Sequence, residues 1–212
     1  MVAGGTGGHI YPAISIINKI KKMEPGSEFL YIGTTDRMEK DIVPKLGIKY
    51  VGIEMTGLNR KNLLSNFKVL GMYRKAVSKA KSVIKEFDPD IVIGVGGYIT
   101  APVLYAAHKL KYKTAIHEQN SIPGLSNKFL SRFVDKVFVS LPGSVKYFSK
   151  DKVVYTGNPR SEEGTNNGKE KSHCILSGSA DVEKSHFICK ADRKTCKHYR
   201  READYRHYAP LL

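Results

Sequence analysis

Short apolar runs alternate with longer amphipathic segments from the start of the chain to about residue 163. The runs of strand length are Phe29–Ile32, Tyr50–Ile53, Ile91–Val95, Thr114–His117, Val137–Val139 and Val153–Tyr155. The segments between them place apolar residues at helical spacing, as Ile10, Ile14 and Ile17 do. Buried strands separated by helices predict an α/β fold with a doubly wound parallel sheet, in which helices cover both faces.

Prolines and polar residues predict where the helices begin. The first helix follows a glycine cluster, and Pro12 is expected in its first turn, where proline is tolerated. Asp36 and Glu39 have the spacing of a capping box and predict a second helix that runs towards Gly47. Further helices are expected from about Leu63 to Phe87, after Pro102, and near Pro123–Val134.

Both ends of the chain depart from this pattern. Only Met1-Val2-Ala3 precede the first glycine loop, whereas a strand has about five residues on average. We therefore expect the natural start to lie upstream, with Met1 an internal methionine. After Glu163 the alternation stops, so residues 1–163 are predicted to form one domain and residues 164–212 an atypical, disordered tail.

The composition narrows the classes of partner. A net charge of +15 indicates an anionic partner, which can be a phosphorylated substrate, a membrane surface or nucleic acid. Nucleic acid is not expected, because no recognition motif is present. No apolar run approaches the roughly 18 residues of a membrane span, and no signal peptide is apparent, so we expect a cytoplasmic protein. Cys189, Cys196 and His198 lack the spacing of a zinc site, and no metal is expected.

The first glycine loop reads Gly4-Gly5-Thr6-Gly7-Gly8-His9 and lies between a strand and a helix. Glycines let the backbone approach a phosphate, and the helix N-terminus offers free N–H donors. The dinucleotide fingerprint does not fit, because Ile10 stands where its third glycine belongs, and no Walker lysine follows. A plain turn needs fewer glycines, so the loop predicts phosphate binding.

A second glycine loop follows the strand Ile91–Val95 and includes Gly96, Gly97 and Tyr98. The first and fourth strands of a doubly wound sheet flank the switch point where ligands bind. The next strand ends in His117-Glu118-Gln119-Asn120, so three loops are expected to converge on one crevice. Glu118 fits a ligand-facing role or a solvated loop carboxylate equally, whereas His117 is expected to be satisfied within the fold.

His9 is a candidate general base. It lies in the first turn of a helix, where the positive helix end lowers the pKa of an imidazole and keeps it neutral. A neutral imidazole can accept a proton from a sugar hydroxyl. Donation of a hydrogen bond to a phosphate oxygen is the alternative role, and the residues alone leave both open.

Four motifs together resemble the MurG family of N-acetylglucosaminyltransferases, which convert lipid I to lipid II in peptidoglycan synthesis. They are Gly4–Pro12, Gly96–Pro102, His117–Lys128 and Thr156–Arg160, in family order. The resemblance runs from residue 1 to about residue 163 and implies the N-terminal, acceptor-side half of a GT-B fold with two Rossmann-like domains. It implies inverting transfer from UDP-GlcNAc to the muramyl 4-hydroxyl of lipid I, without a metal or other cofactor and with His9 as candidate base.

The resemblance also implies roles for the loop residues. The residues expected to bind the UDP-GlcNAc donor are Thr6, Gly7, Gly8, Asn120 and Arg160. Those expected to bind the acceptor and its diphosphate are Gly4, Gly5, Gly96, Gly97, Tyr98, Glu118 and Gln119. Residues 164–212 show no counterpart of the family's third glycine loop, so little activity is expected from this chain alone. The alternatives are a non-catalytic, acceptor-binding subunit of a split glycosyltransferase and a nucleotide-binding module without catalysis.

The segment from Arg60 to Lys75 mixes large apolar residues with five cations. Basic amphipathic segments bind anionic membranes, so it predicts peripheral contact with the cytoplasmic face of the cell membrane. The residues expected to make that contact are Leu63, Leu64, Phe67, Lys68, Arg74 and Lys75. An ordinary helix with a core face and a solvated basic face is the alternative.

Overall fold

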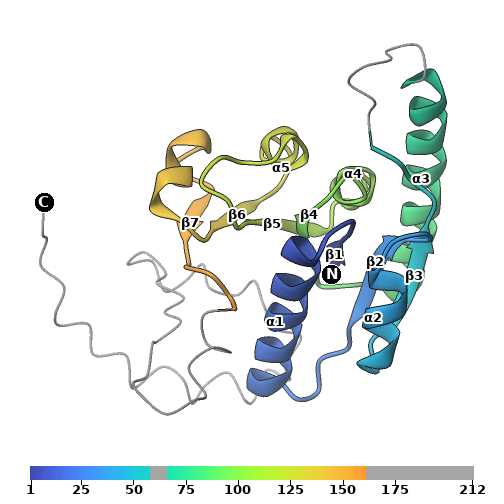
Figure 1. Cartoon of the computed structure of the whole chain (residues 1–212), viewed down its shortest axis with the longest axis horizontal. Coiled ribbons are helices and arrows are strands. Elements are labelled where there is room, and N and C mark those ends of the chain that lie inside the picture. The colour runs from blue at the N-terminus through green and yellow to red at the C-terminus, as the bar shows by residue number, and fades with distance from the viewer. Residues whose placement is uncertain (58–65, 161–212) are drawn as a thin grey trace, which may run out of the picture.

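A computed structural model describes residues 1–57 and 66–160 and contains one seven-stranded parallel sheet (Figure 1). The strand order is β3-β2-β1-β4-β5-β6-β7, which is that of a doubly wound sheet. The strands are β1 (Val2–Ala3), β2 (Leu30–Thr34), β3 (Lys49–Ile53), β4 (Ile91–Gly96), β5 (Lys113–Glu118), β6 (Lys136–Val139) and β7 (Val153–Tyr155). The predicted fold class is confirmed for this part of the chain.

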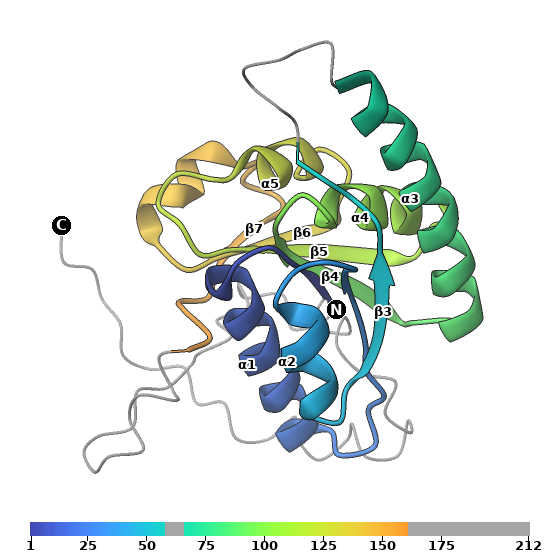
Figure 2. The ribbon, with the colours of Figure 1, turned by 45° about the vertical axis from the view of Figure 1, so that its right-hand side comes forward.

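Helices cover both faces of the sheet, as the two views in Figures 1 and 2 show. One face carries α1 (Gly7–Met23) and α2 (Glu39–Lys45), whose core includes Ile17 and Val43. The other carries α3 (Asn66–Phe87), α4 (Thr100–Lys109) and α5 (Leu125–Leu130), and the 3-10 helix η1 (Pro142–Tyr147) joins β6 to β7. The helices cover the two faces of the sheet but not its carboxyl edge, so the loops that follow the strands can form a site there.

The first strand is short and lies at the centre of the sheet, beside the fourth, as expected of the two strands that flank the switch point. β1 pairs in parallel with β2 on one side and with β4 on the other. Val2 and Ala3 are fully buried, and they point into opposite cores because successive side chains of a strand alternate between faces. The reversal of strand order therefore falls between β1 and β4, directly below the two glycine loops.

Two local predictions are wrong. Pro12 lies in the second turn of α1 rather than the first, because that helix already begins at Gly7. Asp36 and Glu39 form no capping box: α2 begins at Glu39 after Met38, without a side-chain cap. The Glu39 side chain turns inwards instead and is fully buried. The spacing of a capping box is present, but the carboxylate accepts hydrogen bonds from Gly5 and Thr34 instead of capping the helix.

Several predictions fall on residues that the structure does not describe. The tail after residue 160 lies outside the described residues, and so do Leu63, Leu64, Cys189, Cys196 and His198. The side chains of Phe67 and Lys68 are likewise outside them. Within residues 1–57 and 66–160, no helix has both the length and the apolar character needed to cross a membrane.

Candidate functional site

The two glycine loops pack backbone against backbone at the switch point. The Gly4 amide donates to the Gly96 carbonyl at 3.3 Å. A Cβ added to Gly97 would lie 2.2 Å from the Gly4 carbonyl oxygen, so only a residue without a side chain fits there. Gly97 also has a φ of +87°, in the left-handed region that favours glycine. The predicted convergence of these loops is therefore found in the fold.

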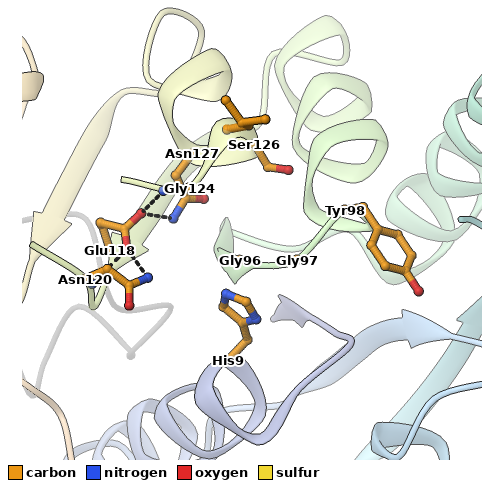
Figure 3. A pocket seen from close by; sticks show the side chains of 10 residues that line it. His9, Gly96, Gly97, Tyr98, Glu118, Asn120, Gly124, Ser126 and Asn127 are labelled. Carbon is orange, nitrogen blue, oxygen red and sulfur yellow. Dashed lines mark hydrogen bonds between the residues drawn. The ribbon is translucent and has the colours of Figure 1, made fainter. Parts of the chain in front are cut away.

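His9 lies over the second loop, at the start of α1 (Figure 3). A Cβ on Gly96 would come within 2.4 Å of His9 Cδ2, so the imidazole occupies the space that the glycine leaves. His9 Nδ1 lies 3.1 Å from Thr6 Oγ1, and this contact orients the ring. Burial lowers the pKa of His9, and the nearby Glu118 carboxylate partly opposes the shift. The direction is the expected one, but its main cause is burial.

A hollow opens between His9, the second glycine loop and the start of α5 (Figure 3). Its lining residues are His9, Gly96, Gly97, Tyr98, Glu118, Asn120, Gly124, Leu125, Ser126 and Asn127. They come from α1, from the loops after β4 and β5, and from α5. The hollow thus joins three of the loops that were predicted to converge, with an imidazole of lowered pKa at one wall.

Glu118 is a buried organiser of one wall rather than a solvated loop carboxylate, so that alternative is wrong. It is 1% exposed, and each of its carboxylate oxygens accepts two hydrogen bonds. Oε1 accepts from the amide and the side chain of Asn120, at 2.8 and 2.9 Å. Oε2 accepts from the Gly124 amide and from Asn127 Nδ2, each at 3.0 Å. One carboxylate therefore fixes both the Asn120 side chain and the start of α5.

His117 is buried in the fold, but the prediction that it is satisfied there holds for Nε2 only, because its buried Nδ1 has no hydrogen-bond partner among the described residues. It is 3% exposed, and its Nε2 lies 3.1 Å from Ser140 Oγ. Burial lowers the pKa of His117 to about 4, although the Gly157 backbone and Glu118 oppose the shift. The Gln119 side chain is partly buried and does not line the hollow, although its neighbours Glu118 and Asn120 do.

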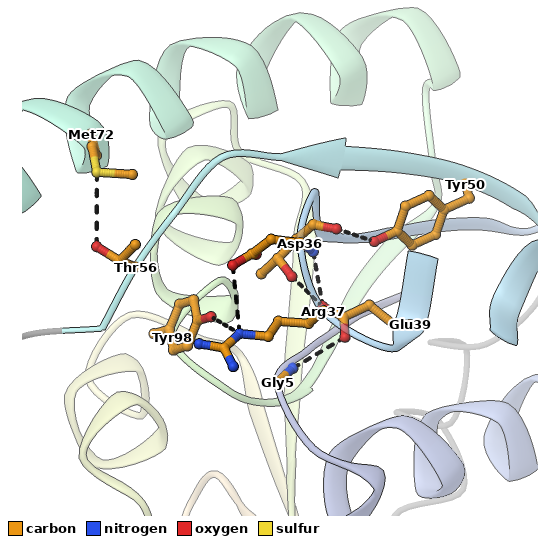
Figure 4. A network of polar contacts seen from close by, with 9 residues as sticks. Gly5, Asp36, Arg37, Glu39, Tyr50, Thr56, Met72 and Tyr98 are labelled. Atoms are coloured by element: carbon orange, nitrogen blue, oxygen red, sulfur yellow. Dashed lines mark hydrogen bonds and ion pairs between the residues drawn. The ribbon is translucent and has the colours of Figure 1, made fainter. Parts of the chain in front are cut away.

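The buried Glu39 binds the backbone of the first glycine loop from inside the protein (Figure 4). Its Oε2 accepts from the Gly5 amide at 3.3 Å, and its Oε1 accepts from Thr34 N and Oγ1 at 3.0 and 2.7 Å. The amides of Gly4 and Gly5 are thus bonded inside the protein. The amides of Gly7 and Gly8, at the first turn of α1, have no hydrogen-bond partner among the described residues.

Tyr98 reaches across the first loop to an arginine that the sequence did not single out. Arg37 Nε donates to Tyr98 Oη at 3.2 Å, over 61 positions of sequence (Figure 4). Asp36 Oδ2 lies 3.7 Å from the same nitrogen. The Tyr98 bond is the main cause that raises the pKa of Arg37, and the guanidinium is charged in any case.

Arg160 approaches the site from the loop after β7. Its guanidinium carbon lies 5.0 Å from the ring centroid of Tyr11, on α1. The Tyr11 ring also covers Gly7, where an added Cβ would lie 3.1 Å from Tyr11 Cε2. Of the predicted donor residues, Gly7 is therefore linked to Arg160 through Tyr11, whereas Asn120 lies at the wall of the hollow beside Glu118.

The helix α3 has a core face and a basic outer face. Its buried residues are Val69, Ala76, Ala80 and Ile84. Leu70 is 50% exposed, and Arg74 and Lys75 are exposed.

Within residues 1–57 and 66–160, no group of three or more His, Cys, Asp or Glu side chains is arranged to hold a metal ion.

Sequence reasoning missed several residues of this region. Arg37 and Tyr11 act through partners that only the fold brings near. Leu125, Ser126 and Asn127 line the hollow, although the motif that contains them carried no predicted role for them. The sequence offered no signal for Asn127, because its partner Glu118 stands nine residues earlier and only the fold shows that this carboxylate is buried beside it.

Known proteins resemble this chain over the same residues. The model of the glycosyltransferase family 28 N-terminal domain matches residues 1–139. A UDP-N-acetylglucosamine–N-acetylmuramyl-(pentapeptide) pyrophosphoryl-undecaprenol N-acetylglucosamine transferase of Bacillus cereus is 53% identical over 160 residues, which are 76% of this chain and 44% of the relative. The transferase of the same name from Halalkalibacterium halodurans is 49% identical over 168 residues, 79% of this chain and 46% of its own length. The chain thus spans less than half the length of these relatives.

Solved structures also match about three quarters of this chain. MurG of Acinetobacter baumannii superposes with a TM-score of 0.62 at 29% identity, covering 74% of this chain and 44% of that one. A UDP-GlcNAc 2-epimerase from Neisseria meningitidis, bound to UDP-GlcNAc, superposes with a TM-score of 0.55 at 18% identity, covering 74% and 45%. At that identity the epimerase shows a shared fold and nothing more.

Proposed function

The chain belongs to glycosyltransferase family 28, and from this premise we propose that it supplies the acceptor side of an inverting N-acetylglucosaminyltransferase. The reaction joins GlcNAc from UDP-GlcNAc to the muramyl 4-hydroxyl of lipid I and gives lipid II for peptidoglycan synthesis. The observation that carries the proposal is His9, set between two interlocked glycine loops at the wall of a hollow. The names and lengths of the relatives support it.

His9 is the proposed general base. Its lowered pKa keeps the imidazole neutral at cytoplasmic pH, so it can accept a proton. In the proposed step the muramyl 4-hydroxyl oxygen attacks C1 of GlcNAc while its proton passes to His9. The bond from C1 to the UDP oxygen breaks, UDP carries away the electron pair, and attack from the opposite face inverts C1. The contact of Nδ1 with Thr6 leaves Nε2 as the nitrogen for this work.

The donor diphosphate is proposed to lie at the first turn of α1. The amides of Gly7 and Gly8 are available there, and the helix end favours negative charge. Thr6, Asn120 and Arg160 complete the proposed donor contacts. Gly96, Gly97, Tyr98, Glu118 and Gln119 are assigned to the acceptor side, with Gly4 and Gly5 acting through the loop packing that they provide. UDP-GlcNAc is a substrate in this scheme, and no cofactor is proposed.

The protein is proposed to work at the cytoplasmic face of the cell membrane. Leu70, half exposed beside the cations Arg74 and Lys75, gives α3 an amphipathic outer face. Four aromatic rings form a row that begins at Tyr73 of α3. The distances between successive ring centroids are 6.4 Å from Tyr73 to Tyr105, 6.0 Å from Tyr105 to Phe133 and 5.2 Å from Phe133 to Phe129. A lipid-linked acceptor fits a protein that touches the membrane with such a surface.

A chimaera tests the proposal. Residues 1–160 of this chain would replace the matched region of the Bacillus cereus relative, and transfer of radiolabelled GlcNAc to lipid I would be measured. We expect transfer by the chimaera and a fall of at least about 100-fold in kcat for its His9→Ala variant, because general-base catalysis contributes that much. A folded chimaera that binds UDP-GlcNAc without transferring it would refute the assignment.

The 212-residue chain provides a second arm of the same experiment. If it restores transfer when the donor half of the relative is added as a separate protein, the split-enzyme alternative is favoured. An unchanged kcat in the His9→Ala chimaera would remove His9 from the role of base while leaving the acceptor assignment intact.

A further inference from the structure

The hollow beside His9 lacks a permanent cation, although its proposed ligand is anionic. Among its lining residues only His9 can carry positive charge, and the lowered pKa of His9 keeps it neutral. Glu118 adds a negative charge to the opposite wall. A diphosphate in such a hollow needs a counter-charge from a neighbouring residue, because an unpaired charge that is removed from water is costly.

Arg37 is placed to supply that charge. It stands in the loop between β2 and α2, with a side chain that is 53% exposed. Its Nε is held by Tyr98 Oη at 3.2 Å, and Tyr98 itself lines the hollow. Among the described residues, its contacts with Tyr98 Oη and with Asp36 Oδ2, at 3.2 and 3.7 Å, both use Nε, which leaves the terminal guanidinium nitrogens for a ligand. Figure 4 shows the guanidinium beside the Tyr98 ring, between Tyr98 and the Glu39–Gly5 contact.

The position of Arg37 is fixed by its surroundings. Two residues after it, the buried Glu39 ties this loop to Gly5 and Thr34. Gly33 permits the tie, because a Cβ there would lie 2.6 Å from Glu39 Cγ. Glu39 therefore anchors the start of the arginine loop and the first glycine loop to one carboxylate, and the bond to Tyr98 sets where the guanidinium lies. An exposed arginine that only solvates the surface needs no such anchoring.

We propose that Arg37, oriented by Tyr98, binds an oxyanion of the acceptor through its terminal guanidinium nitrogens. A guanidinium fork matches the paired oxygens of a phosphate or a carboxylate. The oxyanion belongs either to the lipid-linked diphosphate or to a carboxylate of the muramyl peptide. This inference rests on the proposed function and adds to it a specificity-determining residue outside the glycine loops.

Calorimetric titration of the 212-residue chain tests the inference with two probes. Geranyl diphosphate carries the diphosphate without the sugar, and N-acetylmuramyl pentapeptide carries the carboxylates without the diphosphate. The variants are Arg37→Gln, Arg37→Lys and Tyr98→Phe. Lys45→Gln is the matched control, because it removes one exposed charge at the far end of α2. Urea midpoints of all variants would establish that each is folded.

We expect Arg37→Gln to weaken binding of one probe about tenfold or more, as loss of a charge-assisted hydrogen bond does. Arg37→Lys should weaken it less, and Lys45→Gln by less than about twofold, since an exposed charge at a distance is screened. Tyr98→Phe should weaken it without adding to the effect of Arg37→Gln, because Tyr98 acts partly through the arginine. Such non-additivity is not expected of two independent contacts.

The outcomes separate the possible sources of the oxyanion. A loss confined to geranyl diphosphate assigns Arg37 to the diphosphate, and a loss confined to the muramyl peptide assigns it to a carboxylate. Equal affinity of Arg37→Gln and the unaltered chain for both probes would overturn the inference and leave the proposed function standing. Failure of the unaltered chain to bind either probe would overturn both.

Discussion

Replacing Gly97 with alanine tests whether the two glycine loops depend on direct backbone contact. Gly97 has a φ of +87°, which costs a residue with a Cβ roughly 1–2 kcal/mol. The new methyl group would lie 2.2 Å from the carbonyl oxygen, 3.1 Å from the carbonyl carbon and 3.3 Å from the amide nitrogen of Gly4. These are backbone atoms of the central strand's loop, so no side-chain rotation relieves the overlap. Forcing such an overlap costs about 1–3 kcal/mol more.

The matched control is Gly47→Ala, at the end of α2. Gly47 has a φ of +69°, but nothing lies within 4 Å of an added Cβ. It therefore isolates the cost of the backbone conformation, roughly 1–2 kcal/mol. The total for Gly97→Ala is about 2–5 kcal/mol, a large part of the roughly 5–15 kcal/mol that stabilises an ordinary domain.

Urea unfolding followed by circular dichroism measures both variants. Gly97→Ala should lower the midpoint clearly more than Gly47→Ala, with similar slopes, since the slope reports the surface exposed on unfolding. In the chimaera, Gly97→Ala should also impair transfer, because the displaced loop carries Tyr98. Equal midpoints for the two variants would show that the loops separate at no cost, so that the contact between Gly97 and Gly4 does not stabilise the site.

Four further changes give measurable results. Burial lowers the pKa of His117 from 6.5 to about 4, so the unfolded chain binds a proton at a higher pH than the folded chain. The free energy of unfolding should therefore fall by roughly 3 kcal/mol as pH drops from 6.5 to 4. In urea titrations, His117→Gln should lose this dependence on pH. Glu118→Gln should lower the free energy of unfolding, measured by urea titration, by about 2–4 kcal/mol, because a neutral amide cannot accept all four hydrogen bonds. Leu70→Ser should weaken binding to anionic vesicles, whereas Leu46→Ser, equally exposed, should not. Gly8→Ala should keep the urea midpoint of the parent yet reduce transfer by the chimaera; full activity would exclude a ligand at this glycine.

The architecture of residues 1–57 and 66–160 was largely predictable from periodicity. Strand runs such as Ile91–Val95 carry apolar residues without interruption, as strands buried on both faces do. Even the two-residue β1 flanks the switch point together with β4, as was predicted from the glycine loop that follows it. The failures were local. Pro12 was placed a turn too early because the helix starts among glycines, which have low helix propensity.

The site was predictable where it depends on local motifs and not where it depends on long-range contacts. His9 and the loop glycines stand next to one another in sequence, so helix-end chemistry was enough to single them out. Arg37 stands in an ordinary turn, and its partner Tyr98 lies 61 residues away. Glu39 had the spacing of a capping residue, but backbone donors of Gly5 and Thr34 claim it in the fold. No local pattern records such contacts.

Most glycines of the two loops are required by packing within the protein and not by contact with a ligand. Gly96 and Gly97 are required by protein packing, since an added Cβ would meet His9 and the Gly4 backbone respectively. Gly4 likewise makes room for Glu39, whose Oε1 would lie 2.6 Å from a Cβ. At Gly8 the nearest atom to an added Cβ is Thr6 Oγ1, at the ordinary contact distance of 3.7 Å, so the fold does not require glycine there. Gly8→Ala therefore tests the proposed phosphate contact at the start of α1 without an expected cost to folding.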